Sequence, residues 1–91
     1  MNATIRKGLS KLHERLSKVN DDLEEIKGEV EEVKSEEESK YENLPESFQQ
    51  GEKGEQMQSA IDSLDNAYSQ LEDAINAVND ALSSIDDSSS N

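Results

Sequence analysis

Residues 5–33 read IRKGLSKLHERLSKVNDDLEEIKGEVEEV, and this stretch decides the fold because its apolar residues recur at alternating gaps of four and three. Such spacing places an apolar residue at positions a and d of each heptad, the pattern of a helix packed against other helices. We predict a helix over residues 3–42, although its last turns have charged residues in the core positions. The seam comprises Leu9, Leu16, Leu23 and Val30 at a, with Ile5, Leu12, Val19, Ile26 and Val33 at d.

A second seam of the same spacing occupies the C-terminal half, where we predict a helix over residues 55–86. Alanines precede its a positions at intervals of seven, which widens the apolar stripe to three positions per heptad. A stripe of that width is more typical of a helix bundle than of a narrow two-stranded coil. The seam comprises Met57, Ile61, Leu64, Tyr68, Leu71, Ile75, Val78, Leu82 and Ile85, and the alanines are Ala60, Ala67, Ala74 and Ala81.

The two seams are separated by residues 43–54, which contain the only proline of the chain, Pro45. We predict a turn there, with Gly51 and Gly54 in the positive-φ region that favours glycine. We expect Tyr41, Leu44 and Phe48 to plug that end of the molecule. The tail over residues 87–91 has no apolar residue and is expected to be disordered. The whole chain, residues 1–91, is thus predicted to be a single all-α unit, a helical hairpin of two long antiparallel helices.

The distribution of charge favours this folding back. Residues 1–20 carry a net charge of +4 and residues 72–87 a net charge of −5, so an antiparallel arrangement brings opposite charges together. At the turn end the acidic stretch 21–52, with a net charge of −10, lies beside residues 53–71 at −2. Salt screens such exposed charges, which makes that repulsion tolerable.

One hairpin covers each apolar stripe on one side only, so we predict that copies associate through their seams into a four-helix bundle or another coiled-coil oligomer. Leucine at a with isoleucine or valine at d also favours higher-order packing over a parallel dimer. The sequence leaves open a dimer, trimer or tetramer. It also leaves open a parallel pairing of first helices that sets Asp22 against the partner's Lys27 and Glu29 against the partner's Lys34. The predicted oligomer core comprises Leu9, Leu12, Leu16, Val19, Leu23, Ile26, Val30, Ile61, Leu64, Tyr68, Leu71, Ile75, Val78 and Leu82.

Composition excludes several classes of function. A net charge of −13 argues against gripping nucleic acid directly through a basic surface, and the absence of cysteine excludes thiolate metal sites and thiol catalysis. His13 is the only histidine and is interpreted as an ordinary flanking residue at position e. No phosphate loop, calcium loop or catalytic triad motif is present. We therefore expect no enzyme activity, no cofactor and no membrane span, and a cytoplasmic location.

Two functions follow from these patterns. The first is a non-catalytic interaction or assembly module whose main partner is a second copy of the chain. The second is an acidic inhibitor that mimics DNA phosphates and occupies a nucleic-acid-binding or defence protein of a host cell. Its motivation is a cluster of exposed acids beside the turn, together with an apolar residue there. The candidate partner surface comprises Glu31, Glu32, Glu36, Glu37, Glu38 and Phe48.

The segment over residues 41–75, YENLPESFQQGEKGEQMQSAIDSLDNAYSQLEDAI, resembles a pattern of small acidic helical proteins from bacteriophages and mobile elements. In that pattern a charged coiled coil is followed by N-L-P-E-x-x-Q, then G-E-x-M, then repeated A-I-x-x-L heptads. The resemblance implies a phage or prophage accessory protein acting in a bacterial host, and it implies no functional residue. It is carried by Asn43, Leu44, Pro45, Glu46, Gln49, Gly54, Glu55 and Met57, with Phe48 where the pattern has leucine.

Overall fold

The computed structural model describes residues 2–90, apart from the side chain of Ser90, and this part of the chain is all-helical. Three helices follow one another: α1 over Ala3–Glu42, α2 over Glu46–Gln49 and α3 over Glu52–Ser90. The prediction of an all-α chain is confirmed. The described residues contain no β-strand.

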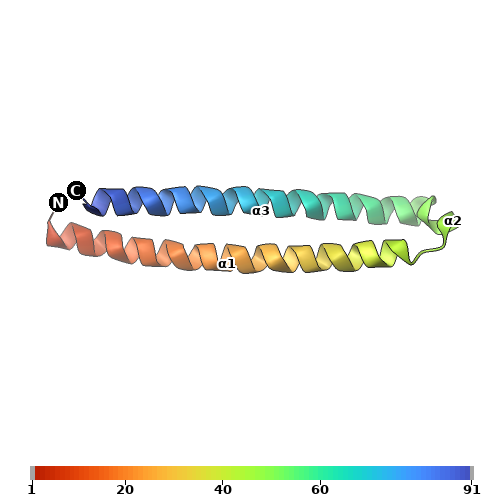
Figure 1. Ribbon diagram of the computed structural model, residues 1–91, viewed down its shortest axis with the longest axis horizontal. Helices are drawn as coiled ribbons and strands as arrows, with labels where there is room; N and C mark the ends of the chain where they lie inside the picture. The colour runs from red at the N-terminus through yellow and green to blue at the C-terminus, as the bar shows by residue number, and fades with distance from the viewer. Residues whose placement is uncertain (1, 91) are drawn as a thin grey trace.

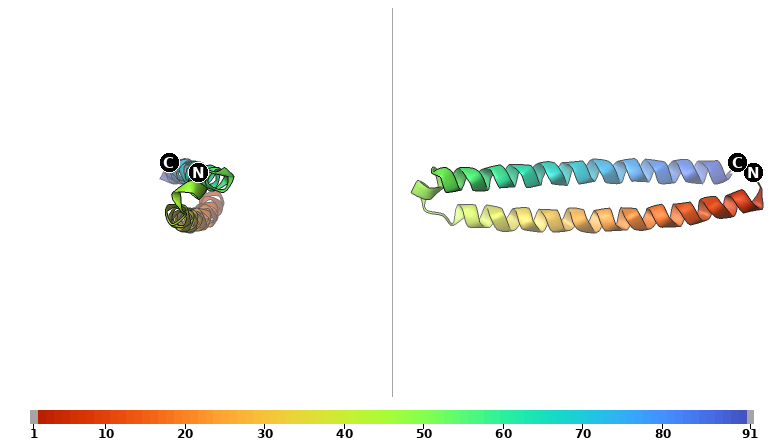
Figure 2. Two further views of the ribbon diagram at one scale, coloured as in Figure 1. Left: turned by 90° about the vertical axis from the view of Figure 1, so that its right-hand side faces the viewer. Right: turned by 180° about the vertical axis from the view of Figure 1, so that it is seen from behind.

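The long helices α1 and α3 lie side by side and run in opposite directions, with α2 across one end (Figure 1). The start of α1 and the end of α3 therefore lie together at the other end of the rod, as Figure 2 shows from two more sides. The Cα atoms span 69 × 14 × 13 Å, so the molecule is about as long as one of its long helices and two helices wide. We call this arrangement the two-helix rod.

Local hydrogen bonds define where the long helices begin. The side chain of Asn2 accepts a hydrogen bond from the backbone N–H of Ile5 at 2.9 Å, which caps the free N–H groups of the first turn of α1. At the start of α3 the backbone N–H of Glu55 donates to the carbonyl of Gly51 at 3.1 Å. Acidic Glu52 and Glu55 lie in this first turn, where carboxylates interact favourably with the helix dipole.

The bounds of α3 differ from those expected. The helix begins at Glu52, three residues earlier than predicted, and it continues through Ser90 instead of ending at residue 86. The prediction of a disordered tail is therefore wrong for residues 87–90, while Asn91 lies outside the described residues. Once a helix is formed, each further residue adds one backbone hydrogen bond, so the helix continues through this segment without apolar side chains.

The turn is a compact unit built around Gln49. Its side-chain amide donates to the carbonyl oxygen of Tyr41 at 2.9 Å and of Glu42 at 3.5 Å. These are two of the carbonyls that the C-terminal end of α1 leaves without a helical partner. A side chain from α2 thus closes the end of α1, and this fixes where the chain turns toward α3.

Gly54 has a steric function in this turn, because it admits the backbone of Gln49. A Cβ atom at Gly54 would lie 2.0 Å from the Gln49 carbonyl oxygen, a distance that side chains do not tolerate. Among the described residues no glycine has positive φ, so the expectation for Gly51 and Gly54 is wrong. The reversal is made by the short helix α2 between two ordinary bends, and glycine is needed for close approach.

Candidate functional site: an association surface

Helix α1 turns its a and e positions toward α3, and its d positions away from α3. The a residues Leu9, Leu16, Leu23 and Val30 are all half-buried against α3. The d residues are about half exposed: Ile5 50%, Leu12 48%, Val19 48%, Ile26 45% and Val33 51%. A row of aliphatic side chains along the length of α1 therefore lies in solvent.

Helix α3 buries more of its stripe because that stripe is wider. Ile61 and Ile75, at a positions of α3, are 7% and 4% exposed and are the only buried hydrophobic residues among those described. The d positions of α3 are half-buried, as are Ala67 and Ala74 at g. On a helical wheel d and g adjoin, so these residues border the same side of the rod as the exposed d row of α1. We call this side the open face.

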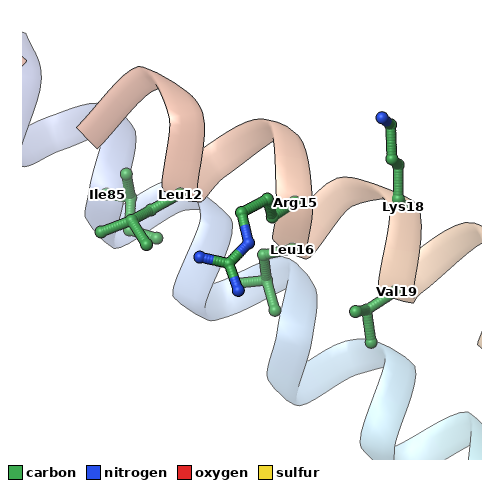
Figure 3. Close-up of a pocket in the computed structure, with 6 residues that line it drawn as sticks. All are labelled: Leu12, Arg15, Leu16, Lys18, Val19 and Ile85. Atoms are coloured by element: carbon green, nitrogen blue, oxygen red, sulfur yellow. The ribbon is translucent and has the colours of Figure 1, made fainter. Parts of the chain in front are cut away.

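A groove marks the open face near the chain ends. It has a volume of about 570 Å³ and is lined by α1 residues of the d row and its neighbours together with Ile85 of α3. In Figure 3 Ile85 lies beside Leu12, Arg15 extends toward α3 next to Leu16, and Lys18 points away from α3. The groove thus has apolar walls from both helices and cations along its α1 edge.

The opposite side of the rod is closed by polar pairs between e positions of the two helices. His13 Nε2 lies 3.2 Å from Asp86 Oδ1. The amide of Asn20 donates to Asn79 Oδ1 at 2.9 Å. Lys34 Nζ lies 3.0 Å from Asp65 Oδ1. The pairs are spaced by whole heptads along both helices, as an antiparallel register requires. We call these three pairs the e ladder.

Two lysines complete the closed side. Lys27 Nζ lies 5.4 Å from the ring centroid of Tyr68, a cation–π contact over an a residue of α3. The hydrogen bond that Lys34 donates to Asp65 raises the pKa of Lys34, opposed by burial and aided by the negative charges of Asp65, Glu31 and Glu38. Because both lysines are engaged within the chain, a parallel pairing of first helices through them would have to break these contacts.

The structure divides the predicted oligomer core into two groups. The a residues of α1 and the a and d residues of α3 pack within the chain, including Tyr68, which is half-buried under Lys27. Only the d row of α1 stays exposed for another molecule. The members that pack within one chain are Leu9, Leu16, Leu23, Val30, Ile61, Leu64, Tyr68, Leu71, Ile75, Val78 and Leu82; the exposed members are Leu12, Val19 and Ile26.

The predicted acidic partner surface is only partly on the outside. Glu31, Glu32 and Glu36 are exposed, whereas Glu37 and Glu38 are half-buried. Glu38 also lies 3.7 Å from Lys34. Phe48 is 56% exposed, so the expectation that it plugs the turn end is wrong. The short helix α2 carries this ring past the end of the rod, where Tyr41 and Leu44 are half-buried.

The e ladder is the feature that sequence reasoning missed. His13 was interpreted as a flanking residue, and its contact with Asp86 shows that it helps to align the two helices. The available signal was the matching series of polar residues at e in both seams. Reading it required the antiparallel register, which only the structure supplies.

No group of three or more His, Cys, Asp or Glu side chains in the described residues is arranged to hold a metal ion. None of the helices described here is long and apolar enough to cross a membrane. Comparison with known protein families, curated proteins and solved structures finds no match for this chain.

Proposed function

We propose that the chain is a helical hairpin that pairs with a second copy through its open face, and that it acts as a non-catalytic interaction or assembly module. The observation that carries the proposal is the exposed d row of α1, whose five side chains are 45–51% exposed in the single chain. Aliphatic residues spaced along a whole helix cost free energy in water, and a second hairpin removes that cost.

The size of the open face supports a second hairpin as its occupant. The rod measures 69 by 14 Å between its outermost Cα atoms. Covering one long side removes on the order of 1,000 Å² from each copy, whereas a stable interface needs about 800 Å² per partner. Two such rods packed face to face make a four-helix bundle with one continuous core.

The turn geometry bears on the resemblance to small phage proteins. Gln49 and Gly54, two of the residues that carry it, cap α1 and admit the α2 backbone. Both residues therefore have a structural role in the turn. On this resemblance we extend the proposal to a phage or prophage accessory protein. Such a protein would act through the surface that the assembled bundle presents to other molecules.

The proposal is tested with a double variant of the open face, Val19→Glu with Ile26→Glu. The exposed half of each side chain is worth about 1 kcal/mol on burial, so four side chains per dimer contribute about 4 kcal/mol. We expect the dissociation constant in sedimentation equilibrium to rise on the order of a thousandfold.

A matched control adds the same two charges on the outward side of α1, as Ser10→Glu with Ser35→Glu, both of which are exposed. This control should associate like the unmodified chain. Circular dichroism of all three proteins should show high helicity at concentrations where they associate. A helical monomer of the unmodified chain at micromolar concentration, or equal association of both double variants, would contradict the proposal.

A further inference from the structure

The α1 edge of the open face carries segregated charge. Along the g positions of α1, which border the d row, and the c positions beside them, the first half presents cations and the second half presents carboxylates. All of these side chains are exposed, and Arg15 and Lys18 line the groove. The cations are Lys11, Arg15 and Lys18, and the acids are Asp22, Glu25, Glu29, Glu32 and Glu36.

The α3 edge of the same face is uncharged over residues 56–88, and its one charge is Lys53 in the first turn of α3. Beyond that first turn its c and g positions hold only small or neutral residues, so nothing along most of this edge attracts or repels a charge on a partner. The α1 edge of the open face is therefore charged along its length, whereas the α3 edge is almost uncharged. The uncharged residues of the α3 edge include Ala60, Ser63, Ala67, Gln70, Ala74, Ala77, Ala81, Ser84 and Ser88.

Two hairpins can meet face to face with two-fold symmetry in two ways. With the axis along the rods, the two turns lie at the same end and α1 packs over α3 of the partner. With the axis across the rods, the turns lie at opposite ends, α1 packs over α1 of the partner and α3 over α3. The first arrangement sets each charged edge against a neutral one. The second sets the cationic half of each α1 against the acidic half of the other.

We propose the second arrangement, an antiparallel dimer in which α1 contacts the partner's α1. This inference rests on the proposed self-association and specifies its geometry. Electrostatic complementarity selects orientation because the wrong arrangement forfeits the attraction on both α1 edges. The neutral α3 edges then meet each other, where alanines at g allow the two helices to approach closely.

Full overlap of the rods specifies the register, because it places the two-fold axis near the middle of α1 at Asp22. Arg15 then lies opposite the partner's Glu29, and by symmetry this contact occurs twice. In the d rows the same register sets Val19 at the level of the partner's Ile26. Asp22 meets its own copy at the axis and is the one like-charge contact along the edge.

Cross-linking at the axis tests the orientation, and the chain has no native cysteine to interfere. Asp22→Cys should give a covalent dimer in high yield with a short bifunctional maleimide. Asp21→Cys, one residue away on the outward side of α1, is the matched control and should remain largely uncross-linked. If sedimentation shows a dimer but Asp22→Cys cross-links no better than the control, the orientation is wrong and the proposed function stands. If sedimentation shows no dimer, the proposed function fails as well.

Charge exchange tests the register independently. Arg15→Glu puts acids opposite each other at two symmetric contacts, so we expect the dimer to weaken about three- to tenfold at low salt. Adding Glu29→Arg in the same chain restores opposite charges and should recover most of that loss. An arrangement of α1 over the partner's α3 predicts little effect of either change and no recovery. Absence of recovery would overturn the register.

Discussion

Replacing Gly54 by alanine should destabilise the protein, although the same change in a helix normally stabilises it. The added Cβ would meet three backbone atoms of Gln49, at 2.0, 2.5 and 2.7 Å. Backbone cannot rotate away as a side chain does, so α2 must shift by about 1 Å or more to reach ordinary contact distance. That shift pulls Gln49 from the carbonyls of Tyr41 and Glu42, which it bonds at 2.9 and 3.5 Å.

The expected magnitude combines opposing effects. Overpacking costs about 1–3 kcal/mol, and the loss of the capping bonds costs about 1 kcal/mol more. The better helix propensity of alanine returns about 1 kcal/mol. The net loss is about 1–3 kcal/mol in the free energy of unfolding, which corresponds to a melting temperature lower by about 5–20 °C.

Gly28→Ala is the matched control, because nothing lies within 4 Å of a Cβ built there. It should raise the free energy of unfolding by about 1 kcal/mol, so the two variants differ in sign. Urea unfolding followed by circular dichroism at one fixed protein concentration measures both. If Gly54→Ala is as stable as Gly28→Ala, the close approach of Gln49 to Gly54 does not hold the turn.

Two contacts of the e ladder give further predictions. The raised pKa of Lys34 means that its pair with Asp65 contributes fully below the pKa of the unfolded chain and is lost as pH rises through the folded value. The stability difference between the unmodified chain and Asp65→Asn should therefore shrink in urea titrations between about pH 9 and pH 12; a constant difference would refute this. The buried Asn20 Oδ1 has no hydrogen-bond partner, so Asn20→Leu should raise the free energy of unfolding by about 1 kcal/mol. Asn79→Leu leaves the half-buried Asn20 amide without its acceptor, so thermal unfolding should show a free energy of unfolding lower by about 1 kcal/mol. A loss of stability in Asn20→Leu would mean that the amide pair is favourable.

Much of the candidate site could be predicted from the sequence, because the large apolar residues of the open face all belong to the two heptad seams. The d row of α1 is part of the periodic pattern, and its exposed members Leu12, Val19 and Ile26 belong to the predicted core. The turn is less predictable, since the steric function of Gly54 depends on a contact with Gln49 across a bend. Likewise, the exposure of Phe48 depends on the direction in which α2 leaves α1.

By itself the sequence determined that the chain is helical and where α1 lies, because heptad spacing is a local property and each apolar step repeats the same signal. Only the tertiary structure decided which arc of each helix its neighbour covers. One neighbour covers about a third of a helix, so a stripe spanning a, d and their flanks always has a side left over. In α1 the polar pairs of the e ladder draw the a and e rows onto α3, and the d row is the side that remains.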